Sequence, residues 1–418
     1  MSNDTQPEIR FPGFTEDWEE RKLNDFISGD ISDGDWIEKE HIKDEGKYRI
    51  IQTGNIGNGV YIDKEKSAKY MDQNSFDILK ANEIFPGDLL VSRLAEPAGR
   101  TVILPNIEDR MVTAVDVTIL RQNENFDAYF LLSQMNTSKI LNKVSKNVSG
   151  TSHKRISRKN LEKVTIDSTS IEEQNKIGAF FKQLDDTIAL HQRKLDLLKE
   201  TKKGFLQKMF PKNGAKVPEI RFPGFTEAWE ERKLETLFEK GGSGGTPKST
   251  NPDYYRGDIP FLGISDISNS NGYIKKTEKS ITLEGLNNSA AWVVPKGAIS
   301  LAMYASVGKL AILNIDVATS QAFYNMVFND DRLRDFVYQR LSMANDLGEW
   351  IKLISTGTQA NLNADKVKNF VIQLPSNIEE IGKIGSFLNQ IDNTIILHQR
   401  KLDLLKETKK GFLQKMFV

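Results

Sequence analysis

Polar side chains that could read nucleic-acid bases gather in loops that follow strand-like stretches of this sequence. Arginine and lysine suit the acceptor edge of guanine, whereas glutamine and asparagine suit adenine. The candidates are Gln52, Thr53, Asn55, Ser92, Arg93, Thr151, Ser152, His153, Lys154 and Arg155, followed by Ser265, Tyr304, Ser306, Lys309, Thr358, Gln359 and Asn361. Each alone fits an ordinary loop side chain equally well, so the set as a whole carries the interpretation.

Motifs for catalysis are incomplete. GGSGGTPKS at 241–249 resembles a phosphate-binding loop, but Pro247 stands where the second glycine is needed and has no N–H to offer a phosphate. NPDY at 251–254 resembles the Asn-Pro-Pro-Tyr motif of amino-methyltransferases, yet no glycine-rich signature for S-adenosylmethionine follows any strand. The four histidines are scattered and cysteine is absent. The sequence therefore predicts no catalytic residue and no metal site in this chain.

Composition describes a globular protein of 418 residues in which 57 basic and 57 acidic residues cancel. The whole chain is thus no obvious polyanion binder. Residues 139–163 hold eight Lys or Arg and one acid, Glu162, which indicates either a cationic patch or a solvated face. No apolar run approaches the ~18–20 residues that span a bilayer, and the first residues lack signal-peptide features. We therefore expect a cytoplasmic protein.

The elements that position these loops are duplicated. PEIRFPGFTEDWEERKL at 7–23 returns at 218–234 with one change, Asp17 to Ala228. LHQRKLDLLKETKKGFLQKMF at 190–210 returns unchanged at 397–417. Between these blocks lie two variable cassettes. A repeat period of 207–211 residues is far too long for a solenoid, so the sequence predicts a duplicated pair of domains.

Each half ends in one predicted long helix, because no proline interrupts 171–210 or 378–417. About 40 helical residues span roughly 60 Å. A heptad seam with 4,3 spacing runs through Leu184, Ile188, His191, Leu195, Leu198, Lys202, Phe205 and Met209, and again through Ile391, Ile395, His398, Leu402, Leu405, Lys409, Phe412 and Met416. Such seams bury against another helix, so we expect the two helices to pair as an antiparallel coiled coil. The histidines and lysines either lie at the seam's edge or fix its register.

The cassettes are predicted to share one mixed α/β fold. Strand patterns bounded by turn residues occupy 47–57, 88–94, 100–105 and 117–120, and then 258–267, 297–305 and 309–314. Helical patterns occupy 125–145 and 331–351. Both cassettes close with a Gly-Thr turn before a short helix and a final strand. Constant apolar residues combined with changing polar loop residues are what we expect of recognition loops that bind different targets.

Together these features resemble the specificity (S) subunit of type I restriction–modification enzymes, over nearly the whole chain. The carriers of the resemblance are both pairs of repeats and GGTPKSTNPDYYRGDIPFLGISDI at 244–267. In that family NPDY lies at the start of a target recognition domain, which agrees with the interpretation that it is not a catalytic motif. The resemblance implies an α+β protein with two target recognition domains and two conserved regions whose long helices form the coil.

The resemblance also implies function. Each domain would read one half of a split, asymmetric DNA sequence, and the coil would set the gap. Two methyltransferase (M) subunits would supply S-adenosylmethionine and catalysis, and two restriction/motor (R) subunits would use ATP and Mg; no cofactor is expected in this chain. Alternatives are a self-sufficient adenine DNA methyltransferase and a coiled-coil adaptor without DNA binding.

The repeats set the expected domain boundaries. These are an N-terminal repeat block at 1–23, a first recognition domain at 24–170, a central conserved region at 171–234, a second recognition domain at 235–377 and a C-terminal conserved helix at 378–418.

Overall fold

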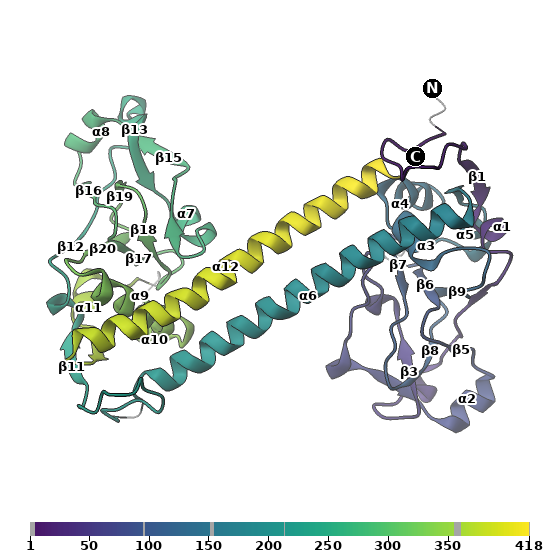
Figure 1. Ribbon diagram of the computed structural model, residues 1–418, viewed down its shortest axis with the longest axis horizontal. Helices are drawn as coiled ribbons and strands as arrows, with labels where there is room; N and C mark the ends of the chain where they lie inside the picture. Colours follow the sequence, from purple (N-terminus) through teal and green to yellow (C-terminus); the bar gives the residue numbers. More distant parts are fainter. Residues whose placement is uncertain (1–4, 95–96, 151–153, 213, 355–360, 418) are drawn as a thin grey trace. The chain divides into compact units, whose positions relative to one another are not determined.

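The computed structural model describes residues 5–94, 97–150, 154–212, 214–354 and 361–417. The chain divides into two compact units, Met1–His191 with Lys401–Val418, and Gln192–Arg400. Each unit contains one cassette together with the beginning of one long helix and the end of the other. Figure 1 labels the helices and strands where there is room.

The first unit contains, in chain order, β1 (Glu19–Lys22), α1 (Leu23–Phe26), β2 (Ile31–Asp33), β3 (Tyr48–Ile51), β4 (Lys69–Met71), α2 (Gln73–Leu79), β5 (Glu83–Ile84), β6 (Leu89–Ser92), β7 (Thr101–Ile103), β8 (Arg110–Thr113), β9 (Val117–Leu120), α3 (Ala128–Met135), α4 (Ser138–Ser145), α5 (Arg158–Glu162) and β10 (Thr165–Ser168). The long helix α6 (Ile171–Met209) begins in this unit and ends in the second.

The second unit continues with β11 (Glu230–Lys233), β12 (Lys240–Ser243), β13 (Tyr255–Leu262), α7 (Ile264–Asn269), β14 (Tyr273–Ile274), β15 (Lys279–Ile281), α8 (Leu283–Asn287), β16 (Val293–Val294), β17 (Ile299–Ala302), β18 (Leu310–Leu313), β19 (Val317–Thr319), β20 (Phe323–Val327), α9 (Asp331–Asp346), α10 (Glu349–Lys352), α11 (Ala364–Lys368) and β21 (Val371–Leu374). The second long helix, α12 (Ile378–Lys415), begins here and ends in the first unit.

The two cassettes have the same strand order. The sheet β2-β9-β6-β7 corresponds to β12-β20-β17-β18, which β14 extends, and β4-β3-β8-β5 corresponds to β15-β13-β19-β16. In the latter sheets the equivalent central pairs, β3 with β8 and β13 with β19, are parallel. The prediction of two mixed α/β domains related by internal duplication is therefore confirmed.

Most predicted elements are shorter than their patterns, and in three of them one residue explains the break. The helix expected at 125–145 is two helices, because Thr137 accepts the amide of Ile140 and starts α4. The helix expected at 331–351 breaks at Gly348, whose φ of 66° lies in the left-handed region. The strand expected at 258–267 stops at β13, since Asp266 accepts the amide of Gly263 at 2.8 Å and turns the chain into α7.

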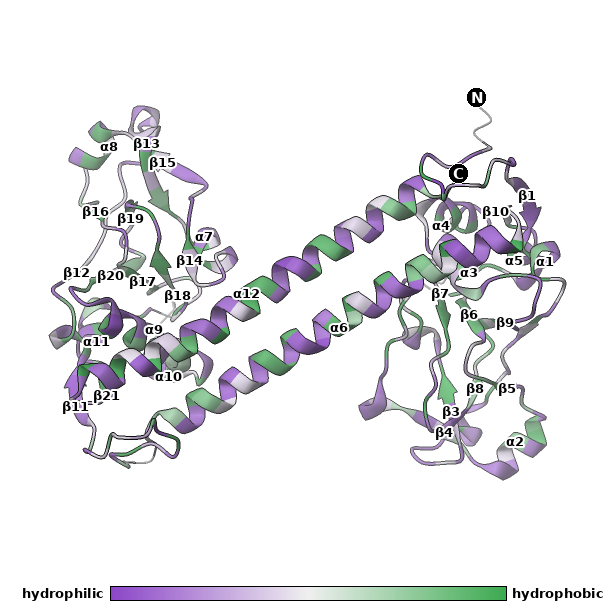
Figure 2. Cartoon of the chain, viewed as in Figure 1, coloured by the Kyte–Doolittle hydropathy of each residue, from purple (hydrophilic) through white to green (hydrophobic). Residues whose placement is uncertain are grey.

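Apolar side chains from sheets and helices form the core of each cassette. Figure 2 colours strands such as β7 and β18 as hydrophobic, whereas the long helices alternate between hydrophobic and hydrophilic stretches. Phe130 and Phe181 are fully buried in the first unit, and Phe336 and Trp350 in the second. The long helices thus contribute to the cassette cores and do more than link them.

Antiparallel packing of α6 and α12 is confirmed within each unit. In the first, Phe180 packs against Phe412 with ring centroids 4.9 Å apart, and Asp185 pairs with Lys409 at 2.6 Å. In the second, Phe205 packs against Phe387 at 4.9 Å, and Lys202 pairs with Asp392 at 2.6 Å. None of the sixteen predicted seam residues is exposed. Because each seam lysine pairs with an aspartate of the other helix, the register interpretation has a physical basis.

The duplicated N-terminal blocks clamp the helices in the same way in both units. β1 pairs with β10, and β11 with β21, both antiparallel. Arg10 binds Glu173 at 2.7 Å, as Arg221 binds Glu380 at 2.7 Å. The amide of Ile9 donates to the carbonyl of Lys415 at 2.9 Å, and Ile220 donates to Lys208 at 2.9 Å. Near-identical sequence therefore builds near-identical geometry.

Candidate nucleic-acid interface

In the second cassette, three of the predicted loop segments lie together. The turn after β13 leads into α7, and Lys309 Nζ from the β17–β18 hairpin donates to Ser268 Oγ at 3.2 Å. The amide of Leu362, which follows Asn361, donates to the carbonyl of Met303 at 2.8 Å. The β17–β18 hairpin is therefore the centre of the cluster and connects the other two segments.

The first cassette brings the equivalent hairpin and loop together. The amide of Ile156 donates to the carbonyl of Arg93 at 3.0 Å, and Leu94 forms an antiparallel bridge with Arg155. The guanidinium groups of Arg93 and Arg155 both donate to the carbonyl of Val115. The hairpin and the loop before the last short helix thus form one surface in each cassette.

Three of the predicted contact residues are buried and bind other residues of the chain instead. Asn55 is buried and accepts the amide of Gln52 at 3.0 Å, the same turn that Asp266 makes in the second cassette. Ser92 is buried and donates to the carbonyl of Leu94 at 2.7 Å. These side chains lack the exposed surface that a base contact requires.

Arg93 is the third of these residues. Its side chain is buried and lies 3.4 Å from Asp33. Burial lowers the pKa of Arg93, which the charge of Asp33 opposes. Arg93 is therefore a structural cation beneath the hairpin.

The remaining predicted residues lie on or near the surface where they are described. The exposed ones are Gln52, Lys154, Ser265, Tyr304, Ser306 and Lys309, and the half-buried ones are Thr53, Arg155 and Asn361. Thr151, Ser152, His153, Thr358 and Gln359 lie outside the described residues. Ser306 has a φ of 57°, a strained conformation for a residue with a side chain, at the tip of the hairpin.

Three of the eight cations in the predicted patch pair closely with acids from elsewhere in the chain. Lys139 pairs with Asp167 at 2.8 Å and Lys143 with Glu20 at 2.7 Å. Arg155 pairs with Asp116 at 2.9 Å. Counting charges along 139–163 misses these partners, because they lie in other segments.

One candidate residue, Trp36, was not predicted from the sequence. Trp36 is 70% exposed, beside Asp35, whose amide donates to the carbonyl of Thr113 at the end of β8 at 2.9 Å. Asp35 also forms a parallel bridge with Ala114, the residue before Val115. The signal of Trp36 in the sequence is a lone tryptophan directly after a Gly-Asp turn, at 33–36.

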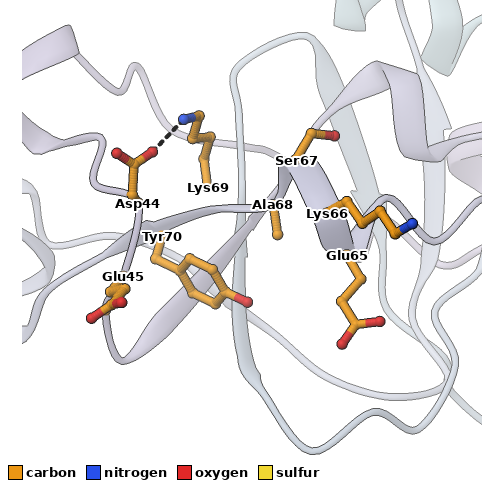
Figure 3. Close-up of a pocket in the computed structure, with 9 residues that line it drawn as sticks. Asp44, Glu45, Glu65, Lys66, Ser67, Ala68, Lys69 and Tyr70 are labelled. Carbon is orange, nitrogen blue, oxygen red and sulfur yellow. Dashed lines mark hydrogen bonds and ion pairs between the residues drawn. The ribbon is translucent and has the colours of Figure 1, made fainter.

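A separate hollow of about 620 Å³ lies in the first unit. Figure 3 shows its lining, in which Lys69 forms an ion pair with Asp44 beside Glu45 and Tyr70. It contains none of the predicted contact residues and mixes both charges, so it offers no defined chemistry. Among the described residues there is no cluster of His, Asp and Glu that could hold a metal, and no helix long and apolar enough to cross a membrane.

Comparison with known proteins decides the family. The model of the type I restriction modification DNA specificity domain matches residues 15–200 and again 226–407. The chain belongs to this family. Each match contains one complete cassette, so this specificity subunit has two target recognition domains.

Relatives agree with this assignment. The chain is 25% identical over 418 residues to the putative MjaX specificity subunit of Methanocaldococcus jannaschii, covering 95% of the chain and 92% of that protein. It is 29% identical over 192 residues to the MjaIX specificity subunit of the same organism, covering 46% of the chain and 44% of that protein. The crystal structure of a type I S subunit from M. genitalium shares the fold, with a TM-score of 0.68, 15% identity and 99% coverage of both chains.

Proposed function

We propose that each recognition domain reads one half of a split, asymmetric DNA target, and that the coiled coil sets the gap between the halves. The observation that carries the proposal is the contrast within the chain. Two domains with the same strand order differ in the side chains of one equivalent surface, the β6–β7 or β17–β18 hairpin with its adjoining loop. Such a surface can change its target while the frame stays constant.

The exposed side chains of this surface suit base contacts. Lys154 in the first domain, and Tyr304, Ser306 and Lys309 in the second, combine donors, acceptors and an aromatic ring, and Gln52 is exposed in the separate turn after β3. Because the net charge of the chain is zero, partner subunits would bind many of the DNA phosphates in this proposal. They would thereby supply much of the affinity for DNA.

Catalysis falls to partners in this proposal. Two methyltransferase subunits would dock on the coiled coil, bring S-adenosylmethionine and methylate adenine N6 on both sides of the target. Two restriction/motor subunits would add ATP- and Mg-dependent translocation and cleavage. The near-identical clamps in the two units support two copies of one partner, because equal partners need equal surfaces.

The test is methylation of random-sequence DNA by the chain with and without its cognate methyltransferase subunit. Methylation only in the mixture, at a two-part motif with a fixed gap, is the expected result. Methylation by the chain alone would identify a self-sufficient methyltransferase instead. If the subunits assemble and no motif is methylated or bound, the chain is a coiled-coil adaptor.

A further inference from the structure

In each cassette, the segment after the first strand is fixed to the end of the central parallel pair. After β2, the amide of Asp35 donates to the carbonyl of the last residue of β8 at 2.9 Å. After β12, the amide of Gly245 donates to the carbonyl of the last residue of β19 at 3.0 Å. The residues that follow, Trp36 and Thr246, therefore stand at equivalent positions in the two units.

A glycine makes this close approach possible in both units. A Cβ at Gly34 would lie 2.3 Å from the carbonyl oxygen of Ala114, and a Cβ at Gly244 would lie 1.8 Å from that of Thr319. No side chain fits at such distances, so only glycine lets the segment pass so close to the strand end. The same contact made twice shows that the two segments are held in the same way.

The residue after each of these positions is held as well. Ile37 packs against buried side chains of β3, β4 and β8. Pro247 is buried, and its carbonyl accepts the hydroxyl of Tyr255 at 2.7 Å. Trp36 and Thr246 thus stand on a backbone that is fixed on both sides. Little backbone entropy remains to be lost if their side chains contact a ligand.

The side chains at these fixed positions differ in chemistry. Trp36 is 70% exposed, whereas Trp18 and Trp229 are 4% and 3% exposed. Thr246 is exposed, and its hydroxyl donates to Oε1 of the exposed Gln321 at 2.8 Å. Side chains so exposed contribute little to the core, so their types are free to serve binding. One unit presents an aromatic ring and the other an oriented amide.

Both positions adjoin the hairpin surface of their cassette. Val115 and Gln321 are each the second residue after the parallel strand β8 or β19. The carbonyl of the next residue accepts the amide of Arg93 in the first unit and of Met303 in the second, both at 2.8 Å. The segment after the parallel strand is therefore bonded to the hairpin in each unit, and the exposed surface of the hairpin continues onto it.

The chemistry of bases distinguishes the two positions. A glutamine amide can accept from N6 of adenine and donate to N7 at the same time. The bond from Thr246 takes one lone pair of Oε1 in Gln321 and leaves the second lone pair and Nε2 for a base. The indole of Trp36 is mainly apolar and suits the methyl group of thymine, which is the apolar group of the major groove.

We infer that Trp36 contacts the methyl group of a thymine in one half of the target, and that Gln321 binds an adenine in the other half. Thr246 acts through Gln321 as a positioning residue, because its hydroxyl fixes the plane of the amide. This inference rests on the proposed function, which supplies the DNA target and its two halves.

The first test is methylation of random-sequence DNA by the variants Trp36→Ala and Gln321→Ala with the cognate methyltransferase subunit. Each variant should relax one A·T position of the motif, where the preference for the correct base should fall about tenfold. The two variants should relax opposite halves, so each is a control for the other. Their melting temperatures should stay unchanged because both side chains are exposed.

A matched control is Ile78→Ala in the first unit. Ile78 is 62% exposed on α2, and Phe76 of the same helix stacks on Tyr48, the first residue of β3, with ring centroids 4.0 Å apart. This helix thus packs at the end of β3 that is distant from Trp36. The control should methylate the unaltered motif.

The second test identifies the atoms that are contacted. Duplexes that contain the motif are bound by the complex of the chain with its methyltransferase subunit. Deoxyuridine at the position relaxed by Trp36→Ala should weaken binding of the unaltered complex about fourfold, the value of one buried methyl group. 7-Deazaadenine at the position relaxed by Gln321→Ala should weaken it about fivefold, the value of one hydrogen bond. The corresponding variant should show neither loss.

The third test concerns the positioning residue. Thr246→Val removes the hydroxyl and should weaken the same adenine preference that Gln321→Ala removes. Thr246→Ser keeps the hydroxyl and should retain the preference. Equal preferences in the two variants would show that Thr246 does not position Gln321.

The outcomes separate the two proposals. If the unaltered chain yields no two-part motif with its methyltransferase subunit, the proposed function fails and the inference fails with it. If it yields such a motif and neither Trp36→Ala nor Gln321→Ala changes it, only the inference is overturned. If a position is relaxed but the base analogues weaken the unaltered complex and the variant equally, the assignment of thymine or adenine to that side chain is wrong.

Discussion

The two units share a frame and differ in what the frame carries. Their clamps match in their contacts, down to equal Arg–Glu distances of 2.7 Å. Their hairpins differ: at equivalent positions the first has a buried arginine, Arg93, and the second a buried methionine, Met303, beside the exposed Tyr304. The sequence is thus nearly identical in the clamps, where both units need the same geometry. It differs at the hairpins, where we propose that each unit binds its own half of the target.

Small differences also exist within the frame. Glu173 accepts hydrogen bonds from Arg10, from Thr169 and, at 3.2 Å, from Trp18 Nε1. In the second unit Glu380 binds Arg221, but Nε1 of the buried Trp229 has no hydrogen-bond partner within the described residues. The first clamp is therefore better connected than the second, and the two can be compared by mutation.

The largest expected effect is on DNA specificity. A chain in which residues 235–377 replace 24–170 carries the second recognition domain twice. It should lose the first half-site completely and, with methyltransferase subunits, methylate two copies of the second half-site in inverted orientation. The measurement is sequencing of methylated adenines in random DNA.

The reciprocal chain, with 24–170 in both places, is the control and should show the first half-site twice. A motif in which both halves are new would contradict independent reading by the two domains.

The next largest effect concerns the clamps. Glu173→Gln and Glu380→Gln each leave a largely buried arginine without its carboxylate, which should lower the free energy of unfolding by roughly 3 kcal/mol. The loss should be greater for Glu173→Gln by about 1 kcal/mol, because Trp18 and Thr169 also lose a charged acceptor. Hydrogen exchange resolved by unit would measure both. Equal losses would show that the extra bonds contribute nothing.

Acid should act through the same carboxylate. Burial alone would raise the pKa of Glu173, but hydrogen bonds from Arg10 and Thr169 outweigh it and lower the pKa. A lowered pKa in the folded state stabilises above the unfolded value, about 4.3, and this contribution disappears as the pH falls through the folded value. Unfolding of the first unit measured from pH 6 to pH 2 should therefore be flatter in Glu173→Gln. An unchanged profile would exclude Glu173 as the titrating group.

Charge reversal compares the two coil pairs. Lys202→Asp and Lys409→Asp each place two acids in contact and should destabilise by roughly 2 kcal/mol. Adding Asp185→Lys should rescue Lys409→Asp. Adding Asp392→Lys should rescue Lys202→Asp only partly, because Asp392 also accepts from Gln339 at 2.8 Å. Urea denaturation measures the free energy of unfolding of the four variants. Complete rescue in both double variants would show that Gln339 does not contribute to the Lys202–Asp392 pair.

The smallest effect should come from the tryptophans. Trp18→Phe and Trp229→Phe remove similar buried volume, but only Trp18 gives up a hydrogen bond to a carboxylate. Trp18→Phe should cost about 1 kcal/mol more than Trp229→Phe. Thermal unfolding of both variants measures the difference, and a reversed order would show that packing outweighs the bond.

The long helices and the duplicated blocks were predicted from the sequence better than the candidate DNA-binding surface. The seam from Leu184 to Met209 and the duplicated blocks are periodic or repeated, so their patterns survive without tertiary information. The short strands β2, β4 and β5 were missed, because two or three residues hold too little alternation to be seen. Breaks such as that at Gly348 depend on one residue's backbone.

The sequence named the loop residues of the candidate surface but not their arrangement. The hairpin and its adjoining loop lie together in each unit, and their contact with DNA stays a prediction. Whether a polar residue there is exposed depends on neighbours from distant segments, such as Asp33 for Arg93 and Ile62 for Asn55. Trp36 was missed for the same reason, because its proximity to β8 arises only in the folded chain.

The interleaving of the helices sets an order of completion during synthesis. The second unit, 192–400, is continuous, so the ribosome has supplied all of it once Arg400 is added. The first unit still lacks 401–417, including Phe417, whose ring lies 6.1 Å from that of Trp18 and 5.4 Å from that of Phe130. The recognition domain that is translated first is thus the one whose core is closed last, and a premature stop codon after Arg400 would damage the half of the protein most distant from it in the gene.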